Sequence, residues 1–436
     1  MALTGRTVLI AALGALVVAA LPGWHGVLLV AVPLLLAVLL DLALAAPVRG
    51  LRLERDGAES VRAGEEARVR LTVTNPSRRA LRGELRDAWT PGAFSDPDEA
   101  YRATRHRLTV PAGERRRMET VLRPSRRGER RPDRVTVRSR GPLGLAARQG
   151  AHRVPWALRV LPPFTSRRHL PAKLARLREL DGRTSVLVRG EGTEFDSLRE
   201  YVPGDEVRSI DWRATARRGS VAVRTWRPER DRHLLLVLDT GRTSAGRVGD
   251  IPRLDVSMDA ALLLTALASR AGDRVDLIAR DRHTRISVRG RSGREVLPAM
   301  VRSMVDLEPA LVETDAPGLA AAARTAAPHR SLIVLFTALD PGPADTGLLP
   351  ILPELLRRHS VMIASVSDPR VAEMARTRGT VSGVYEAAAA ARHQEEREEI
   401  IARVRRMGAT VVEGSPEGLA PAVADAYLAL KAAGRL

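Results

Sequence analysis

A short, almost purely apolar run in the second half of the chain constrains the fold most. Residues 233–238 read HLLLVL, the run ends in the acid Asp239, and the polar residues 240–244, TGRTS, follow. Strands buried on both faces of a parallel sheet are continuously apolar, and open α/β sheets present functional groups at the carboxyl ends of such strands. The pattern therefore predicts a buried parallel strand that delivers a carboxylate and hydroxyl groups to a loop.

Apolar strands and helix-period segments alternate after this run. We expect strands at 274–279, 332–336, 361–366 and 410–412, and an edge strand at 286–288. We expect helices at 254–271, 294–305, 317–326, 348–358 and 385–407, and a last helix capped by Ser415 with Pro416 in its first position. This alternation is typical of a doubly wound α/β sheet with right-handed crossovers, which we assign to residues 233–436.

A polar segment, residues 163–232, precedes this domain. A predicted helix at 172–180 leads into a cluster of acids, arginines and one tryptophan, comprising Asp205, Arg208, Asp211, Trp212, Arg217, Arg224 and Glu229. Because arginine forks pair with carboxylates, the cluster predicts a structural network that holds this segment to the sheet and shapes the sheet rim into a docking face. The alternative is a partner-binding surface anchored by Trp212 and Arg217, since aromatic and arginine side chains dominate such surfaces.

The N-terminal region holds two uncharged apolar segments, at 8–21 and 27–40, joined by the turn PGWHG. They predict a transmembrane helical hairpin within residues 1–46, and so the lipid bilayer as a partner. Four basic residues flank the hairpin, and none lies in its turn: Arg6, Arg49, Arg52 and Arg55. Because basic residues favour the cytoplasmic side, we expect a multi-pass protein of the cell membrane with both ends in the cytoplasm. A signal peptide that ends near residues 19–20 is the alternative.

Residues 47–162 have a different texture. Short alternating segments at 68–73, 107–110, 118–122 and 134–137 are separated by Pro- and Gly-containing turns. Strands of this kind predict a small β-sandwich, of immunoglobulin or fibronectin type in outline. The segment shows no catalytic pattern, and we interpret it as a spacer or a protein-docking module.

The composition narrows the classes of function. The formal net charge is +19, which would normally indicate nucleic acid as a partner, but Lys occurs only at Lys173 and Lys431. Arginine without lysine in an alanine-rich chain is better explained by composition bias, so we expect no nucleic-acid binding. The absence of Cys excludes disulfides and thiolate zinc sites. The sequence also lacks a phosphate-binding loop and the motifs His-Glu-x-x-His and Gly-x-Ser-x-Gly, so we do not expect an enzyme. Two alternatives are a hydrolase that uses acids near Asp239 and a protein that binds nucleic acid through its arginines.

The cluster upstream of the apolar strand resembles a known signature. Its residues include Glu194-Phe195, Leu198-Arg199, Pro203-Gly204-Asp205 and Ile210-Asp211-Trp212. They resemble the signature of the domain of unknown function 58 (DUF58) family, whose members are similar to von Willebrand factor A domains downstream. The resemblance implies a membrane-attached bacterial protein, often encoded beside a MoxR-type AAA+ ATPase, and we interpret the chain as a protein-interaction scaffold. That ATPase is therefore the expected partner, in the assembly or maturation of protein complexes.

A von Willebrand factor A-like domain also implies a metal-ion-dependent adhesion site. The resemblance places Asp239, Thr243 and Thr314 as ligands of Mg²⁺, a cation that prefers oxygen donors. Gly241 stands where the first hydroxyl residue is expected, and Ala338 stands where a third-loop acid is expected. We therefore expect a degenerate site that binds Mg²⁺ weakly. The alternative is that Asp239 caps the loop that follows it.

Overall fold

The chain folds into two compact units, Met1–Pro163 and Phe164–Leu436. The computed structural model describes residues 2–20, 23–187, 194–203, 205–227, 232–291, 293–377 and 379–436. The four-part division predicted from the sequence is finer than this, because it separates the hairpin from the β domain and the signature segment from the α/β domain.

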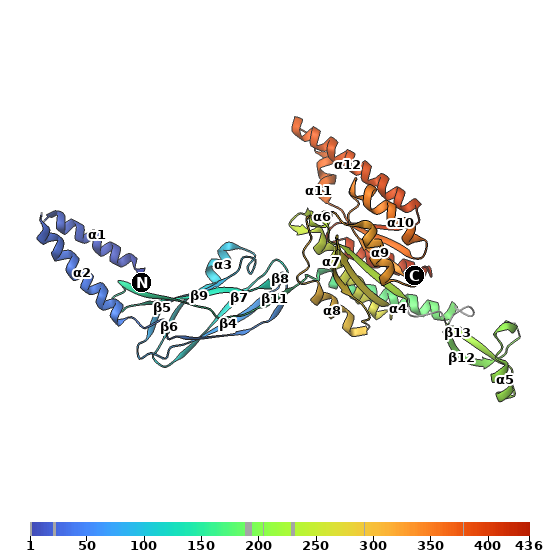
Figure 1. Ribbon diagram of the computed structural model, residues 1–436, viewed down its shortest axis with the longest axis horizontal. Coiled ribbons are helices and arrows are strands. Elements are labelled where there is room, and N and C mark those ends of the chain that lie inside the picture. Colours follow the sequence, from blue (N-terminus) through green and yellow to red (C-terminus); the bar gives the residue numbers. More distant parts are fainter. Residues whose placement is uncertain are drawn as a thin grey trace. The chain divides into compact units, whose positions relative to one another are not determined.

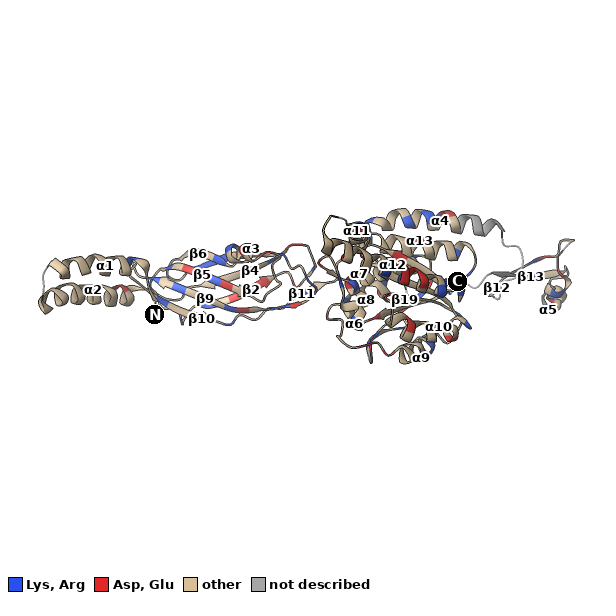
Figure 2. Ribbon diagram, turned by 90° about the horizontal axis from the view of Figure 1, so that it is seen from above, with Lys and Arg blue, Asp and Glu red and all other residues tan. Residues whose placement is uncertain are grey.

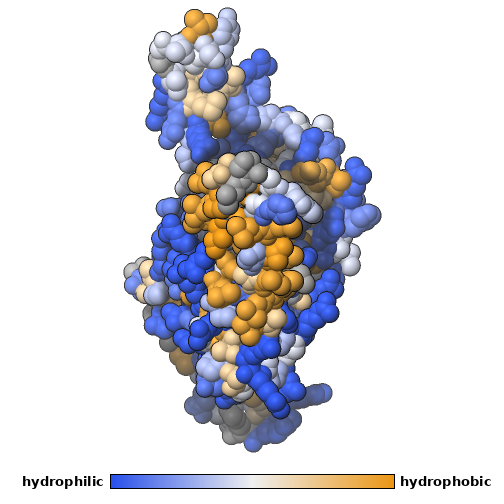
Figure 3. Space-filling view, turned by 90° about the vertical axis from the view of Figure 1, so that its left-hand side faces the viewer, coloured by the Kyte–Doolittle hydropathy of each residue, from blue (hydrophilic) through white to orange (hydrophobic). Residues whose placement is uncertain are grey.

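Two apolar helices begin the first unit, α1 (Gly5–Ala20) and α2 (Trp24–Leu44). They pack closely: a Cβ on Gly14 would lie 2.3 Å from a methyl carbon of Val30, so a larger residue at this position would separate them. Most of their apolar side chains are exposed, and Figure 3 shows apolar residues gathered over this end of the unit. The 21 residues of α2 are long and apolar enough to cross a membrane, whereas α1 is shorter.

A β-sandwich forms the rest of the first unit (Figure 1). A five-stranded sheet has the order β1 (Ala2–Leu3), β10 (Ala146–His152), β9 (Pro132–Arg140), β5 (Leu81–Trp89) and β6 (Arg105–Val110). Two three-stranded sheets have the orders β2 (Arg52–Gly57), β4 (Ala67–Thr74), β7 (Arg115–Leu122) and β3 (Ser60–Arg62), β11 (Leu158–Leu161), β8 (Gly128–Arg130). The short helix α3 (Pro97–Ala103) precedes β6.

The core of the sandwich lies between facing sheets. Alternate residues of β4, including Leu71 and Val73, are buried against Leu81 and Leu85 of β5 and Val137 of β9. Burying each such side chain contributes about 1.5–3 kcal/mol.

The interior of the sandwich also contains an ion pair. The side chain of Arg55, which follows the apolar hairpin in sequence, is 1% exposed and pairs with Asp87 of β5 at 2.5 Å. Alternation along β2 turns Arg55 inward. The membrane orientation expected from the basic residues around the hairpin stays a prediction.

Asp41, near the end of α2, fastens the helix pair to the sandwich. It is fully buried and accepts three backbone N–H hydrogen bonds from the turn between β9 and β10: Leu143 at 2.7 Å, Leu145 at 2.7 Å and Ala146 at 2.8 Å. The start of α1 meets the same turn, because the hydroxyls of Thr4 and Thr7 donate to the Leu145 carbonyl. One turn therefore holds the beginning of α1 and the end of α2 side by side.

A six-stranded sheet forms the centre of the second unit. Its order is β18 (Thr284–Val288), β17 (Arg274–Arg280), β14 (His233–Asp239), β19 (Leu332–Phe336), β20 (Ser360–Val366) and β21 (Thr410–Gly414). All neighbours are parallel except the edge strand β18. The chain moves in opposite directions across the sheet after β14 and after β19, so the carboxyl ends of these two strands form the switch point where open α/β sheets bind ligands.

Helices cover both faces of this sheet (Figure 1). On one face, α9 (Ala316–Ala326), α10 (Leu349–Leu356) and α12 (Val381–Arg406) pack against inward residues such as Leu235 and Val237. On the other, α7 (Arg253–Arg270) contacts α13 (Leu419–Ala432) and α4 (Leu170–Leu187). Shorter elements are α6 (Arg242–Ala245), β15 (Arg247–Val248), β16 (Ile251–Pro252), α8 (Val296–Ser303) and α11 (Pro369–Arg376).

The last helix begins later than predicted. Ser415 was expected to cap it with Pro416 in its first position, but α13 begins at Leu419. The Ser415 hydroxyl instead accepts the N–H of Gly418 at 3.3 Å and closes a turn ahead of the helix. Serine and proline favour such a turn as readily as a helix start, which explains the error.

The signature segment forms a small unit with its own two-stranded sheet, β12 (Glu194–Glu200) paired with β13 (Ala222–Arg227). Between the strands lie a 3₁₀ turn, Val207–Ser209, and the helix α5 (Trp212–Arg218). Gly219 ends α5 in the left-handed conformation, with φ of 74°, as is common one residue beyond a helix.

Candidate functional site

Asp239 lies at the carboxyl end of β14, at the switch point of the sheet, and is 5% exposed. The Thr314 hydroxyl donates to one carboxylate oxygen at 2.5 Å, and the Thr337 hydroxyl donates to the other at 2.7 Å. The N–H of Gly241 also donates to Asp239, at 2.9 Å. One carboxylate therefore ties together the loops that follow β14 and β19 and the loop that precedes α9.

The close approach of Thr314 explains the glycine at position 241. A Cβ on Gly241 would lie 2.1 Å from the Thr314 hydroxyl oxygen. The N–H of Arg242 donates to the Val312 carbonyl at 2.8 Å, which holds the two loops at this separation. A hydroxyl-bearing side chain at position 241 would displace Thr314, so the expected serine cannot be accommodated without moving a loop.

The structure brings together two of the three predicted metal ligands. Asp239 and Thr314 are in contact, whereas Thr243 lies on α6 and lines a hollow of about 10 Å³, room for roughly one water molecule, beside Arg253 and Thr337. Sequence reasoning missed Thr337. Its signal was its position directly after β19, the neighbour of β14 across the switch point.

The acid nearest to the expected third-loop position is already neutralised. Asp340 pairs with Arg253 at 2.5 Å and with Arg397 at 3.4 Å, and Arg397 also pairs with Glu413 at 2.7 Å. Within the described ranges, no group of three or more His, Asp or Glu side chains is placed to hold a metal ion. As they lie, these residues fit a closed hydrogen-bonded cluster better than a Mg²⁺ site, which needs several oxygen ligands at about 2.0–2.1 Å. Mg²⁺ binding by Asp239, Thr243 and Thr314 stays a prediction.

Replacing Asp239 with alanine should lower the free energy of unfolding of the second unit by about 2–3 kcal/mol, because three donors lose their shared acceptor. Urea unfolding of the full chain measures this loss. Asp345→Ala, which removes an exposed pair with Arg403, is the control and should change stability by less than about 1 kcal/mol. If millimolar Mg²⁺ raised the melting temperature of the native chain but not of Asp239→Ala, the metal site would replace the closed cluster as the explanation.

The acids of the signature unit hold that unit together. Asp211 caps α5 by accepting the N–H groups of Arg213 and Ala214, each at 3.0 Å, and it pairs with Arg224 at 2.8 Å. The Ala214 N–H, followed by the Arg224 guanidinium, lowers the pKa of Asp211. Asp205 forms a two-pronged pair with Arg199, at 2.6 and 2.7 Å. The predicted network therefore exists for these acids, and Arg199 is the member that the sequence analysis left out.

This network does not shape the rim of the six-stranded sheet. Asp205 and Asp211 belong to the separate β12–β13 unit, whose strands pair with each other and, through an isolated bridge from Val223 to Ile210, with a residue of the same unit, but with no described strand of the main sheet. The expectation that they form a docking face together with Asp239 is therefore wrong. The acids of this short segment pair with arginines of the same segment, so their pairing does not require contact with the main sheet. Glu229 lies outside the described residues.

The remaining signature residues are exposed. Trp212 is 66% exposed, and Val207 and Val202 are 64% and 55% exposed. Arg208, Arg213 and Arg217 are exposed too, and no carboxylate of the described residues lies within 4.0 Å of them. We call these six residues the Trp212 surface. Within the part of the chain that the structure describes, these side chains therefore take no part in the ion pairs of Asp205 and Asp211. The choice between a structural network and a partner surface at Trp212 and Arg217 stays a prediction.

A serine, a histidine and an aspartate meet near the amino ends of the central strands, at the end of the sheet opposite Asp239. His233 contacts Ser331 at 2.8 Å and Asp276 at 2.9 Å. However, the Ser331 hydroxyl donates to the His329 carbonyl at 2.8 Å and Ser331 is 2% exposed, so neither its proton nor its oxygen is available to a substrate. The arrangement secures the starts of β14, β17 and β19.

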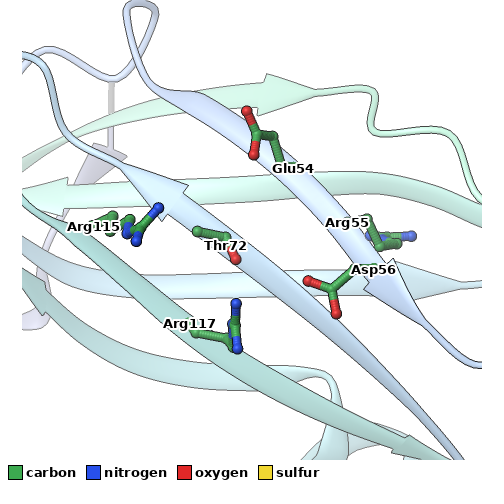
Figure 4. Close-up of a pocket in the computed structure, with 6 residues that line it drawn as sticks. All are labelled: Glu54, Arg55, Asp56, Thr72, Arg115 and Arg117. Atoms are coloured by element: carbon green, nitrogen blue, oxygen red, sulfur yellow. The ribbon is translucent and has the colours of Figure 1, made fainter.

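The sandwich carries an open hollow of about 450 Å³ on the outer face of the β2–β4–β7 sheet (Figure 4). Glu54 and Asp56 of β2 lie across Thr72 from Arg115 and Arg117 of β7. Charges of both signs line it and Asp56 already pairs with Arg70 at 2.7 Å, so the hollow selects neither an anion nor a cation.

Fold and site together define a class of protein: an open α/β sheet with one carboxylate at its switch point, preceded by a small two-stranded unit with an exposed tryptophan. Residues 197–406 match the family model described as "Protein of unknown function DUF58". The resemblance to this family is thereby confirmed for that part of the chain.

Relatives of known sequence share this region. Uncharacterized protein Rv1480 of Mycobacterium tuberculosis is 29% identical over 190 residues, which cover 43% of this chain and 59% of the relative. Uncharacterized protein YeaD of Bacillus subtilis is 26% identical over 157 residues, which cover 36% of this chain and 38% of the relative. The chain thus spans about three fifths of the length of the mycobacterial relative.

Solved structures resemble the chain weakly. The CARDB domain of the PF1109 protein from Pyrococcus furiosus is 11% identical, with a TM-score of 0.18, and the match covers 25% of this chain and 86% of that domain. A beta-glucosidase from Listeria innocua is 16% identical, with a TM-score of 0.15, over 24% of this chain and 16% of the enzyme. Scores this low carry no argument about fold or function.

Proposed function

We propose that this chain is a membrane-anchored scaffold that presents its signature unit and a von Willebrand factor A-like domain to a partner protein in the cytoplasm. The exposed tryptophan of the Trp212 surface, together with three exposed arginines that pair with no carboxylate of the described residues, is the observation that carries the proposal. A side chain of this size gains free energy when a partner covers it, and Trp and Arg supply much of the binding energy of protein interfaces.

The remaining parts of the proposal rest on the fold. The strand order, with an antiparallel edge strand and Asp239 at the switch point, supports a von Willebrand factor A-like domain. The packing of the β2–β4–β7 sheet against the five-stranded sheet supports an immunoglobulin- or fibronectin-like sandwich. The pairing of α1 with α2, and the attachment of both to one turn, support two membrane crossings with both ends on the same side. The basic residues that flank the pair support the cytoplasm as that side. The family resemblance supports a MoxR-type AAA+ ATPase as the partner, in assembly or maturation of protein complexes.

Replacing Trp212 with alanine should weaken capture of that ATPase by the full chain at least about thirtyfold, which corresponds to the loss of one interface hot spot of about 2 kcal/mol. Stability should change by less than about 0.5 kcal/mol, because Trp212 is 66% exposed. Pull-down from detergent-solubilised membranes, with purified ATPase at graded concentrations, measures the first quantity and urea unfolding the second.

Tyr385→Ala on α12 is the matched control, since this aromatic side chain is 75% exposed but lies outside the signature unit. It should leave capture unchanged. Equal losses for the two variants, or a loss of folding in Trp212→Ala that matches its loss of capture, would contradict the assignment of the Trp212 surface as the docking site.

A further inference from the structure

Four arginines lie where the helix pair joins the sandwich, and we call them the arginine collar: Arg6, Arg49, Arg79 and Arg148. Arg148 donates to the Leu42 carbonyl at 2.9 Å, and Arg79 donates to the Ala43 carbonyl, so both contact the last turn of α2. Arg6 lies in the first turn of α1 beside the β9–β10 turn, where a Cβ on Gly144 would be 3.0 Å from its guanidinium. Arg49 is exposed on the link between α2 and β2.

The charges of the collar have no acidic partner in the part of the chain that the structure describes. No Asp or Glu of the described residues forms an ion pair with any of the four arginines, although ion pairs are frequent elsewhere in the sandwich. The acid closest in sequence to the end of α2, Asp41, is fully buried and occupied by three backbone N–H groups. Each guanidinium has five N–H donors, and the bonds of Arg79 and Arg148 to α2 use one from each.

The fold also fixes the height of the collar. At about 1.5 Å per residue, the 21 residues of α2 are about 32 Å long, close to the roughly 30 Å hydrocarbon thickness of a bilayer. If the start of α2 lies at one membrane surface, its last carbonyls emerge at the other. The arginines that contact those carbonyls then lie at the level of the lipid phosphates. Figure 3 views the apolar helices from their free end, and Figure 2 marks basic residues where the helices meet the sandwich.

We propose that the arginine collar binds the phosphate groups of anionic phospholipids on the cytoplasmic side of the membrane. Guanidinium groups bind phosphate with two parallel hydrogen bonds, and anionic lipids concentrate basic side chains at the surface. Because the Asp41 contacts hold α2 against the sandwich, the collar is a rigid binding site rather than a flexible basic tail. The inference rests on the membrane anchoring in the proposed function, but not on the protein partner.

Binding can be measured by native mass spectrometry of the full chain in detergent, titrated with phosphatidylglycerol or with phosphatidylcholine. The native chain should retain phosphatidylglycerol preferentially. Arg79→Gln/Arg148→Gln should weaken this retention about 25-fold, since each arginine near an anionic surface accounts for about fivefold. Because these two arginines also contact α2, Arg6→Gln/Arg49→Gln is a second variant that leaves those contacts in place and should weaken retention similarly.

The control is Arg126→Gln/Arg159→Gln, which removes the same charge from exposed positions near β8 and on β11. It should retain phosphatidylglycerol like the native chain. Equal retention of the two lipids, equal losses in collar and control variants, or displacement of lipid by millimolar inorganic phosphate would each overturn the lipid site. Separate readouts distinguish the proposals: alkaline extraction of membranes tests anchoring, and ATPase capture tests the Trp212 surface.

Discussion

Replacing Asp41 with alanine should release the helix pair from the sandwich and lower the free energy of unfolding of the first unit by about 3–5 kcal/mol. Three backbone N–H groups in the β9–β10 turn lose their acceptor, and hydrogen bonds to a charged group contribute about 1.5–3 kcal/mol each, although such losses do not add fully. Gly141 lets the turn approach the carboxylate this closely, since a Cβ there would lie 2.1 Å from a carboxylate oxygen of Asp41.

Hydrogen exchange of the full chain in detergent measures this effect locally. The amides of Leu143, Leu145 and Ala146 should exchange at least about a hundredfold faster in Asp41→Ala, as expected for a loss of 3 kcal/mol. Asp41→Asn keeps one acceptor oxygen and should show an intermediate change. Asp133→Ala, at an exposed acid paired with Arg134, serves as control. Unchanged exchange in Asp41→Ala would show that the acid does not hold the junction.

The strands of the α/β sheet could be read from the sequence because they are buried on both faces. Residues 332–336 were predicted as a strand and form β19 with the same bounds, and 233–238 form β14 with Asp239 added. In the sandwich, β5 was missed because it reads LRGELRDAW, with several charged residues and a glycine at its third position. Gly83 is required by packing that no local pattern shows: a Cβ there would lie 1.8 Å from the Arg138 carbonyl oxygen.

The sequence predicts the residue of the candidate site that ends a strand, but not the residues that distant loops bring to it. Asp239 was found from the run that precedes it, but Thr337 enters the cluster because β19 happens to be the neighbour of β14, which is a property of strand order. Thr243 has a suitable spacing in sequence, yet α6 places it on the small hollow beside Arg253. Asp205 and Asp211 pair with arginines on β12 and β13. Their positions in the sequence therefore do not predict any contact with the main sheet.

Replacing Arg55 with methionine should lower the free energy of unfolding of the sandwich by about 3–5 kcal/mol, the typical cost of leaving a buried charge without its partner. Both side chains of the Arg55–Asp87 pair are 1% exposed, and Arg55 also lies over the Trp89 ring at 5.1 Å. Trp89 donates to Asp87 at 3.1 Å and the Thr120 hydroxyl donates to it at 3.4 Å, but these neutral donors cannot replace the charge of the guanidinium. Urea unfolding followed by tryptophan fluorescence reports the loss.

The double variant Arg55→Met/Asp87→Leu should regain most of that stability, because a buried pair replaced by apolar side chains is often neutral. Burial raises the pKa of Asp87 and lowers the pKa of Arg55, so desolvation already outweighs the attraction between them. With the folded-state pKa of Asp87 above its unfolded value of about 3.9, the ionised carboxylate destabilises the fold at neutral pH, and acidification through the raised pKa removes this cost. Without Arg55 the pKa rises further, so the deficit of Arg55→Met should be largest near neutral pH and should shrink as the pH falls toward 4. Two outcomes would contradict this explanation: a loss of stability in Arg55→Met that does not change with pH, or a double variant no more stable than the single one. Either would show that the loss comes from the missing packing of the arginine and not from the unpaired charge of Asp87.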